Sequence, residues 1–279
     1  MNILCSPVQW LAAVCLLTLG LNNAAQAAHL SSVACGNIDL AYYENGALYY
    51  RHTDGSYAGI DKDVVEEVER RSGCHFNTML DSRVRIWNRL SNNTLAMSVS
   101  GIATPEREQY ARFIPYFVTR NYVLLHKGVA ATTQTMGGFL ENPALKVGVV
   151  KSFRHGVVYD EWLDKLRAQN RVYEASDFES VMRLFAIGRV DAVLALPTGW
   201  QALLKRENLV GKVAVKDWAP SERVVASLVV SRELVSPEIY ALLEKTLQAM
   251  RDDGSLEEIF KRHISADLAK AMRYEDKKP

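Results

Sequence analysis

Arg107 stands in an unusual place for a basic residue. In the segment IATPER (102–107), Thr104 suits a helix N-cap, Pro105 suits the first helical position, and Glu106 favours the positive end of a helix. A glutamate or glutamine at position 107 would complete a capping box, whereas the arginine adds a cation where the helix dipole is already positive. An anion bound to this guanidinium and to the free N–H groups of the turn would remove that conflict. The segment therefore predicts a site for a small acid group.

A second basic segment, KSFRHG (151–156), has a similar setting, because it also follows an apolar, strand-like run. Ser152 is predicted to cap the next helix, which would put Arg154 and His155 in its first turn. In open α/β sheets, ligands lie beyond the carboxyl ends of the strands. We therefore expect an anion site between this segment and Arg107. Solvated side chains, or surface pairs with neighbouring glutamates, are the alternative.

Strand-like and helix-like segments alternate along the chain. Short apolar runs predict strands, and apolar residues at helical spacing predict helices. The result is one β-α-β-α-β run over 37–99 and a second over 145–196, which is typical of parallel strands with right-handed crossovers. A long strand at 223–230 and two helices follow. Because no low-complexity linker separates the two runs, they predict two α/β lobes joined by strands.

Two helix starts are specific predictions. A helix at about 62–72 should begin with Asp61 as its cap and end at Gly73. In the second run, SDFE (176–179) forms a capping box for a further helix.

Composition bounds the class of protein. The chain has 279 residues and a net charge of +1, which gives no reason to expect nucleic acid or an anionic membrane as a partner. An apolar core at 8–21, followed by the A-x-A sequence AQA, predicts a secretory signal peptide cleaved near Ala27 rather than a retained anchor. No later run approaches the length of a membrane span. The remainder is expected to be soluble and exported.

Cys35 and Cys74 are the two cysteines that follow the predicted signal peptide. Each directly precedes a strand-like run, and parallel neighbouring strands would bring these starting ends together. An oxidising compartment would then allow a disulfide. Two buried free thiols are the alternative.

Several motifs, taken in order along the chain, resemble one known family. They are DGSYAGIDKDVVEEV, SGIATPERE, FIPYF, KVGVVKS, GRVDAVLA and MRDDGSLEEIFKRH, and the match covers residues 37–264. The arrangement is similar to that of the periplasmic solute-binding proteins of the polar amino-acid type, family 3. The resemblance implies a monomeric periplasmic protein that closes on a small solute and docks on an ABC permease. Its α/β fold would have two lobes, each a mostly parallel sheet flanked by helices and joined by two hinge strands, with lobe 1 at 35–117 plus 219–268 and lobe 2 at 120–216.

The same resemblance implies the site residues. Arg107 would bind the α-carboxylate of the solute. The other candidates are groups near that carboxylate or side chains that line the pocket: Ser100, Ile102, Thr104, Ser152, Phe153, Tyr43, Leu48 and Tyr50. Ordinary packing at strand ends is the alternative for the tyrosines.

Two positions depart from the family pattern. Leu196 stands where amino-acid binders carry an aspartate for the α-ammonium, and Arg83 stands near the place of an aromatic clamp. The loss of a carboxylate and the gain of a guanidinium both disfavour a cationic ligand. We therefore expect a small carboxylate, with one or two acid groups, rather than an ordinary α-amino acid. Asp177 or Glu44 could still restore an acid to the site.

An enzyme and a sensor are the rival functions. A periplasmic dehydratase that acts on a prephenate-like acid would need a general acid in the pocket, and His155 and Glu44 are the candidates. A sensor would report the ligand to a partner in trans. The sequence has no Ser-His-Asp pattern, zinc-ligand spacing or P-loop, so we expect no cofactor and no metal.

Overall fold

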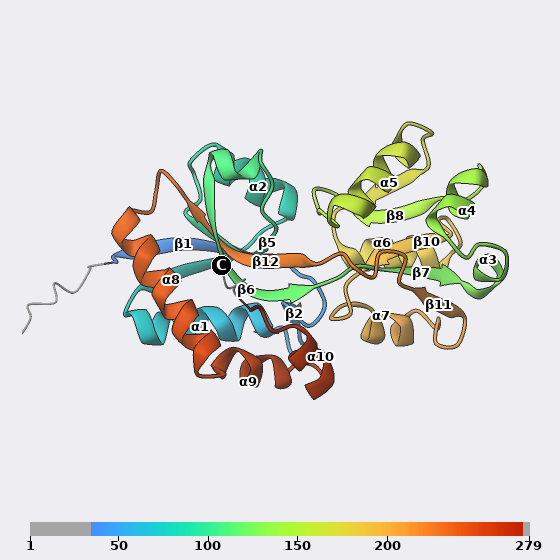
Figure 1. The fold of residues 1–279 in the computed structure, drawn as a ribbon. Coiled ribbons are helices and arrows are strands. Elements are labelled where there is room, and N and C mark those ends of the chain that lie inside the picture. The colour runs from blue at the N-terminus through green and yellow to red at the C-terminus, as the bar shows by residue number, and fades with distance from the viewer. Residues whose placement is uncertain (1–34, 276–279) are drawn as a thin grey trace, which may run out of the picture. The chain divides into compact units, whose positions relative to one another are not determined.

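The computed structural model describes residues 35–275, which form two α/β lobes (Figure 1). Each lobe is built on a five-stranded sheet. The predicted signal peptide (1–27) lies outside the described residues. Within 35–275, no helix has the length and apolar character that a membrane span requires.

The sheet of the first lobe has the strand order β4-β1-β5-β12-β6. β1 pairs in parallel with β4 and β5, whereas β12 is antiparallel to β5 and β6. The strands are β1 (Asn37–Tyr42), β4 (His75–Leu80), β5 (Met97–Gly101), β6 (Ala111–Thr119) and β12 (Val224–Ser231), with a small ribbon of β2 (Tyr50–Arg51) and β3 (Tyr57–Ala58). The helices are α1 (Ile60–Ser72), α2 (Arg83–Ser91), α8 (Pro237–Asp252), α9 (Ser255–Lys261) and α10 (Ala266–Ala271).

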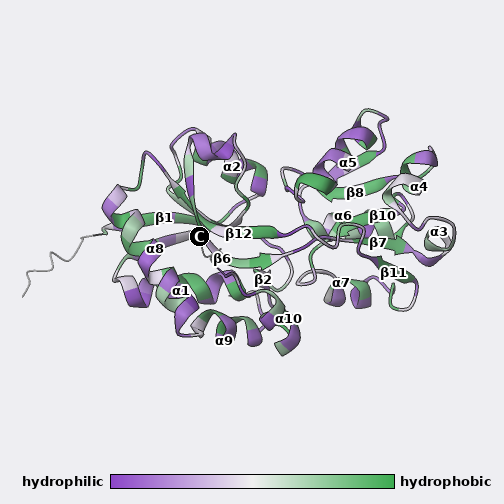
Figure 2. Ribbon diagram, in the orientation of Figure 1, coloured by the Kyte–Doolittle hydropathy of each residue, from purple (hydrophilic) through white to green (hydrophobic). Residues whose placement is uncertain are grey.

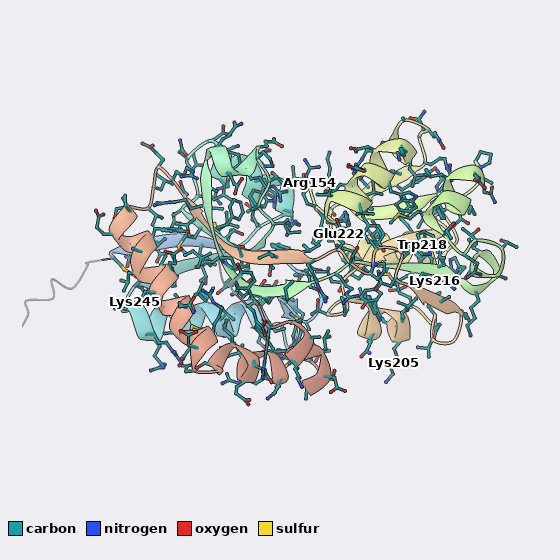
Figure 3. All side chains as sticks on the ribbon, viewed as in Figure 1. Arg154, Lys205, Lys216, Trp218, Glu222 and Lys245 are labelled. Carbon is teal, nitrogen blue, oxygen red and sulfur yellow. A yellow bond between two sulfur atoms is a disulfide. The ribbon has the colours of Figure 1, made fainter. Side chains whose placement is uncertain are left out.

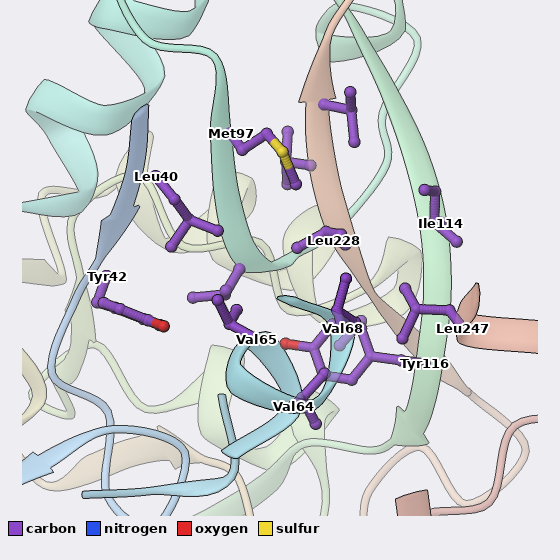
Figure 4. Close-up of a cluster of buried hydrophobic side chains, with 14 of the residues drawn as sticks. Leu40, Tyr42, Val64, Val65, Val68, Met97, Ile114, Tyr116, Leu228 and Leu247 are labelled. Atoms are coloured by element: carbon purple, nitrogen blue, oxygen red, sulfur yellow. The ribbon is translucent and has the colours of Figure 1, made fainter. Parts of the chain in front are cut away.

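The core of this lobe forms where α1 meets the sheet. Val64, Val65 and Val68 share one face of α1 and pack in the same buried cluster as Leu40 and Met97 of the strands (Figure 4). The strands are hydrophobic along most of their length, and hydrophilic segments gather on the helices (Figure 2). This is the division expected when helices cover a sheet with one apolar face each.

The predicted start of α1 is wrong by two residues, although its predicted end is right. The helix begins at Ile60 after Gly59, and Gly73 ends it in a left-handed conformation with φ 73°. Asp61 does not cap the helix, because its carboxylate turns into the core. There it accepts hydrogen bonds from the hydroxyl groups of Tyr116 (2.5 Å) and Ser100 (2.8 Å).

The sheet of the second lobe has the order β11-β7-β10-β8-β9. β8 pairs in parallel with β9 and β10, and β7 is antiparallel to β10 and β11. The strands are β7 (Tyr122–His126), β8 (Val147–Val150), β9 (Val172–Ala175), β10 (Ala192–Ala195) and β11 (Val213–Lys216). The helices are α3 (Lys127–Thr132), α4 (Met136–Glu141), α5 (Val157–Arg167), α6 (Phe178–Ala186) and α7 (Trp200–Arg206).

Both faces of this second sheet are covered. Leu194 of β10 packs in one buried cluster with α4 and α5, whereas its neighbour Val193 packs in another with α6 and α7. Successive residues of a strand point to opposite faces, so a sheet buried on both sides needs a continuous apolar run. The run DAVLAL (191–196) has that character.

Two short connections join the sheets. Residues 120–121 lead from β6 to β7, and residues 217–223 lead from β11 back to β12. They lie next to each other, because Arg120 in one connection pairs with Asp217 in the other at 3.0 Å.

The lobes also touch through main chain. The amide of Ala47 donates to the carbonyl oxygen of Thr198 at 2.9 Å. Gly46 has φ 55°, and a Cβ there would lie 2.5 Å from Cα of Gly199. Only glycine fits this approach.

Cys35 and Cys74 form a disulfide, which confirms that prediction. Their Cα atoms are 4.9 Å apart. The reason is the parallel pairing of β1 with β4, in which Asn37 lies opposite His75. The two cysteines therefore precede adjacent strand starts.

Candidate functional site

A cavity of about 270 Å³ lies between the lobes, and side chains from both of them line it. The first lobe contributes the ends of β1 and β4 with the start of α2. The second lobe contributes the ends of β8 and β10 with the start of α6. These are the carboxyl ends of parallel strands, where ligands bind in open α/β sheets. Lining residues that matter for the argument below are Tyr43, Glu44, Asn45, Arg83, Asn121, Phe153, His155, Asp177, Phe178 and Leu196.

Arg83 supplies the main positive charge of this cavity. It is the first residue of α2, directly after the N-cap Ser82, and its side chain is 3% exposed. The guanidinium lies between two rings, with its carbon 4.2 Å from the centroid of Tyr43 and 4.7 Å from that of Phe153. Its Nε and Nη2 atoms are buried without a hydrogen-bond partner. A buried guanidinium in this state is suited to a carboxylate, which can accept two parallel hydrogen bonds.

Two further polar atoms in the cavity wall have no hydrogen-bond partner, Nδ2 of Asn45 and Oδ1 of Asn121. Nδ1 of His155 faces the carboxylate of Asp160, 3.7 Å from its Oδ1. The main chain of His155 is fixed, since its amide donates to Asp160 at 3.0 Å and its carbonyl accepts from Asn121 at 2.9 Å. Burial lowers the pKa of His155, so the imidazole is neutral near pH 7. Buried polar atoms are normally paired, and a polar solute in the cavity would pair the free amide atoms of Asn45 and Asn121.

The cavity also has an acidic side. Asp177 is the N-cap of α6 and accepts from the amide of Ser180 at 2.7 Å. Burial acts against ionisation of this carboxyl, but hydrogen bonds from Ser176 and Ser180 outweigh it and lower the pKa of Asp177. For Glu44, burial raises the pKa, and the nearby carboxylates of Glu179 and Asp177 raise it further.

Arg107 does not line this cavity. It is 6% exposed, and its guanidinium carbon lies 3.6 Å from the centroid of the Trp87 ring. Nη1 donates to the carbonyl of Ile102 and Nη2 to the carbonyl of Ser152, both at 2.9 Å. Burial, followed by repulsion from Arg83 and Arg154, lowers the pKa of Arg107 to about 9. The guanidinium thus connects the lobes through main-chain oxygens, and its predicted contact with a solute carboxylate stays a prediction.

The space that the resemblance assigns to the carboxylate is almost closed. Between Ser100, Ile102, Phe153 and Leu196 a volume of about 10 Å³ remains. That is roughly the room one water molecule needs, and it is too small for a solute. The open volume lies instead beside Arg83 and Asn121.

The predicted helix starts on which the anion argument depended are wrong. Arg107 begins a 3₁₀ helix of three residues, Arg107–Gln109, although Thr104 Oγ1 does accept from the amide of Arg107 at 3.3 Å. One short turn has little dipole, because the dipole grows with the number of aligned peptides. The chain leaves this turn at once to enter β6 at Ala111.

The second predicted start lies four residues before the observed one. α5 begins at Val157 after Gly156, so Ser152 does not cap it, and Arg154 and His155 precede the helix. Ser152 has a left-handed backbone with φ 62°. Glu222, labelled in Figure 3, accepts from the amide of Val158 at 2.8 Å and thus satisfies the helix start from a distant part of the chain.

Some of the remaining predicted residues line a cavity, and the others are held in the core of the first lobe. Tyr43, Phe153 and Leu196 line the Arg83 cavity, while Tyr50 lines a second cavity of about 500 Å³. Ser100 is occupied by the core, since its amide and hydroxyl bond to Tyr116 and Asp61. Leu48 is buried in the core of the first lobe.

Asn45, Asn121 and Phe178 were not predicted as site residues. No sequence motif marks Asn121. It reaches the cavity because it lies in the connection between β6 and β7, and only the fold places that connection beside the cavity. Within 35–275, no group of three or more His, Cys, Asp or Glu side chains is arranged to hold a metal ion.

Two α/β lobes around a lined cavity define the class of two-lobed solute-binding proteins. A family model for the bacterial extracellular solute-binding proteins, family 3, matches residues 40–266. The chain belongs to this family. No curated protein matches the chain.

Solved structures share the fold. One is an ABC uptake transporter substrate binding protein from Streptococcus pneumoniae with bound histidine (TM-score 0.68, 17% identity, covering 83% of this chain and 94% of that one). Another is an ancestral arginine-binding protein bound to arginine (0.70, 18%, 82% and 99%). A third is the ancestral amino acid-binding protein AncCDT-1, a precursor of cyclohexadienyl dehydratase (0.67, 16%, 82% and 95%). The predicted two-lobed periplasmic-binding-protein fold is confirmed.

Proposed function

We propose that this protein is a periplasmic receptor that binds a small carboxylate-bearing solute between its lobes and delivers it to an ABC permease. The observation that carries the proposal is Arg83, whose buried guanidinium has two free nitrogens at a cavity lined from both lobes. Leaving a buried cation without an anion is costly, and a bound carboxylate removes that cost. For this function we propose the lobe bounds expected from the sequence. Lobe 1 comprises residues 35–117 and 219–268, and lobe 2 comprises residues 120–216.

The size and the walls of the cavity narrow the solute. Ligand pockets usually measure about 300–1,000 Å³, so a cavity of about 270 Å³ suits a small molecule. Tyr43 and Phe153 flank the guanidinium of Arg83 and limit the directions from which an acid group can reach it, and Leu196 offers apolar contact. Arg107 would support the site without touching the solute. Its guanidinium donates to the carbonyls of Ile102 and Ser152, and Thr104 accepts from its amide. These bonds would hold the turn that carries Phe153 against the first lobe.

Binding between two lobes gives a mechanism for delivery. A solute that contacts both lobes stabilises the closed arrangement by as much as it prefers that arrangement over the open one. X-ray scattering should therefore give a smaller radius of gyration with bound solute than without it. An unchanged radius would count against closure.

The test begins with thermal-shift screening against amino acids and organic acids, followed by calorimetry on each hit. Arg83→Met should weaken binding of an acid hit by about tenfold to a hundredfold, because a charge-assisted bidentate contact is lost. Arg70→Met is the matched control, since Arg70 is an exposed arginine of the same lobe with 67% of its side chain accessible. If Arg83→Met binds as tightly as the unchanged protein, Arg83 does not hold the acid group.

A dehydratase is a second candidate, favoured by the buried imidazole of His155 in the cavity wall. A neutral imidazole can accept or donate a proton when the substrate places one within reach. Incubation of the purified protein with prephenate, followed by absorbance of the aromatic product, separates this function from binding alone. His155→Asn should abolish any such product.

A further inference from the structure

A second cavity, of about 500 Å³, adjoins the Arg83 cavity. Both lobes line it, with β2 and α10 contributing from the first lobe and α7 from the second. Figure 1 shows β2 and α10 at the side of the first lobe that is nearest to α7. Glu44, Asp177 and Phe178 line both cavities, so the two share a part of their wall. A solute that is bound to Arg83 and is too long for the first cavity would reach the second beside these three residues.

Most of the second cavity has an aromatic or apolar wall. Tyr50 and His263 line it and meet edge to face, with their ring centroids 6.2 Å apart. Tyr49, which also lines it, stacks on Tyr57 at 5.1 Å. The apolar residues that line the rest are Ala47, Pro197, Leu203, Ile264 and Leu268. Because removing apolar surface from water is favourable, this wall favours a ring or a hydrocarbon chain.

The basic groups that line the second cavity already have partners in the described part of the chain. Arg206 lies 3.0 Å from Glu179, and His263 lies 3.0 Å from Asp63. Arg51 donates to a main-chain carbonyl at 3.3 Å. A second acid group on the solute would have to break one of these contacts to find a cation. An uncharged body meets no such cost.

The two carboxylates of the shared wall act in the same direction. Asp177 accepts from Ser176 and Ser180, and Glu44 makes no hydrogen bond or ion pair in the described part of the chain. Burial raises the pKa of Glu44, and the carboxylates of Glu179 and Asp177 raise it further. Another negative charge would add to this repulsion. The part of the solute that passes here should therefore carry no second acid group.

An independent observation marks the second cavity as a binding site. Oγ1 of Thr198 is buried without a hydrogen-bond partner on a residue that is 8% exposed, and Thr198 lines this cavity. Its carbonyl is engaged, because it accepts from the amide of Ala47 at 2.9 Å. Buried polar atoms are normally paired. A hydroxyl or carbonyl group on the body of the solute would supply the partner that this side chain lacks.

We infer that the solute is an elongated acid with a single carboxylate, and that it occupies both cavities. The carboxylate binds Arg83, an uncharged aromatic or apolar body extends past Phe178, and a neutral polar group pairs with Thr198. The inference rests on the proposed function. It changes two expectations, since the solute is longer than the first cavity and has one acid group instead of one or two. Ligand pockets usually measure about 300–1,000 Å³, and the two cavities together lie within that range.

The probes are straight-chain monocarboxylates with and without a terminal ring. In calorimetry we would compare phenylacetate, 3-phenylpropanoate, 5-phenylpentanoate and 7-phenylheptanoate with acetate, propanoate, pentanoate and heptanoate. At least one aryl acid should bind about tenfold or more tightly than its partner, because the ring leaves water for an apolar cavity. Nonanedioate should bind more weakly than nonanoate, since its second acid group meets the carboxylates of the shared wall.

Ile264→Trp tests the position of the body by filling the second cavity with a larger side chain. It should remove most of the gain that the ring gives, and binding of the acid without a ring is the internal reference. Leu234→Trp is the matched control, because Leu234 is an apolar residue of the same lobe that is 47% exposed and lines neither cavity. Thermal melting shows whether both variants are folded.

Thr198→Val tests the polar contact with little change of shape, and it carries the test if Ile264→Trp does not fold. For the best aryl acid, a hydroxyl at one of the ring positions should strengthen binding to the unchanged protein by about threefold to tenfold. Thr198→Val should cancel that gain. Thr132→Val is the matched control, since Thr132 is an exposed threonine of the same lobe.

The outcomes separate the inference from the proposed function. If no aryl acid gains from its ring, the inference is overturned and the carboxylate function stands. A gain that survives Ile264→Trp would overturn the placement of the body in the second cavity, and a ring hydroxyl without effect would overturn the contact with Thr198. Binding of 5-phenylpentan-1-ol as tight as that of 5-phenylpentanoate would overturn the single solute and indicate a separate site. No binding of any acid, here or in the screen, would overturn the proposed function itself.

Discussion

Asp61 is a carboxylic acid in the core of the first lobe, and its hydrogen bonds lead through Ser100 to the wall of the Arg83 cavity. The residue is fully buried and accepts hydrogen bonds from Tyr116 and Ser100. Ser100 in turn accepts through its carbonyl from the hydroxyl of Tyr43, one of the rings that flank Arg83, at 3.1 Å. Burial raises the pKa of Asp61 to about 7, although the hydrogen bonds from Tyr116 and Ser100 act in the opposite direction. The ionised form is therefore disfavoured in the folded protein.

This shift predicts a pH dependence of stability. Because the folded pKa of Asp61 lies above its ordinary value of 3.8, the folded state holds the proton more tightly than the unfolded state does. The contribution is complete below about pH 4 and is lost as the pH rises to about 7, with a slope of up to roughly 1.4 kcal/mol per pH unit. Urea unfolding at several pH values should show this fall, and Asp61→Asn should lack it. Parallel curves for the two proteins would contradict the prediction.

The two arginines show what the sequence can and cannot reveal at this scale. Arg83 was recognisable as a guanidinium in place of an aromatic side chain, and the structure brings it to the cavity. Arg107 was recognisable as misplaced in a helix start, but its partners were not. They depend on where the carbonyl of Ser152 points, which follows from a left-handed turn and from the approach of two lobes.

The elements were predictable where local chemistry determines them. Helical spacing of valines and the terminal Gly73 mark α1. The segment 176–179 marks the start of α6, but the predicted capping box is wrong by one residue, because Asp177 instead of Ser176 is the N-cap and accepts from the amide of Ser180. The start of α5 was not predictable, because Glu222 satisfies it from 64 positions further along the chain. A cap of this kind leaves no signal in the local sequence.

The disulfide acts on the elements β1 and β4, and we expect it to stabilise the first lobe. It closes a loop with a sequence separation of 39, for which the chain-entropy relation gives roughly 4 kcal/mol. Reduction should lower the melting temperature by roughly 8–15 °C in a protein of this size. Differential scanning calorimetry with and without dithiothreitol measures this, and a Cys35→Ala/Cys74→Ala variant should not respond to the reductant. An equal response in both proteins would show that the reductant acts elsewhere.

At the scale of the whole molecule, the contact between Gly46 and Gly199 limits how the lobes meet. Gly46→Ala would place a methyl group against main chain of the other lobe, where neither side can yield cheaply. We expect scattering to report a more open protein. Affinity for the best acid found by screening should fall by about tenfold, the effect of roughly 1.4 kcal/mol against closure. Gly188→Ala is the control, since Gly188 has φ 70° but no atom within 4 Å of an added Cβ. Equal effects of both substitutions would point to backbone strain instead of contact between the lobes.

The adjacent connections at Arg120 and Asp217 also make the second lobe separable by design. All five strands of the first sheet lie outside residues 122–216, so that sheet is complete without the intervening chain. Residues 122–216 could be removed by cutting the chain at the two connections. The ends, which lie next to each other, could then be joined by a short turn or by the corresponding segment of a relative. Chimaeras built this way would keep Arg83 and Asn121 while exchanging Phe153, Asp177 and Leu196, so the side of the cavity that the second lobe lines could be replaced as one cassette.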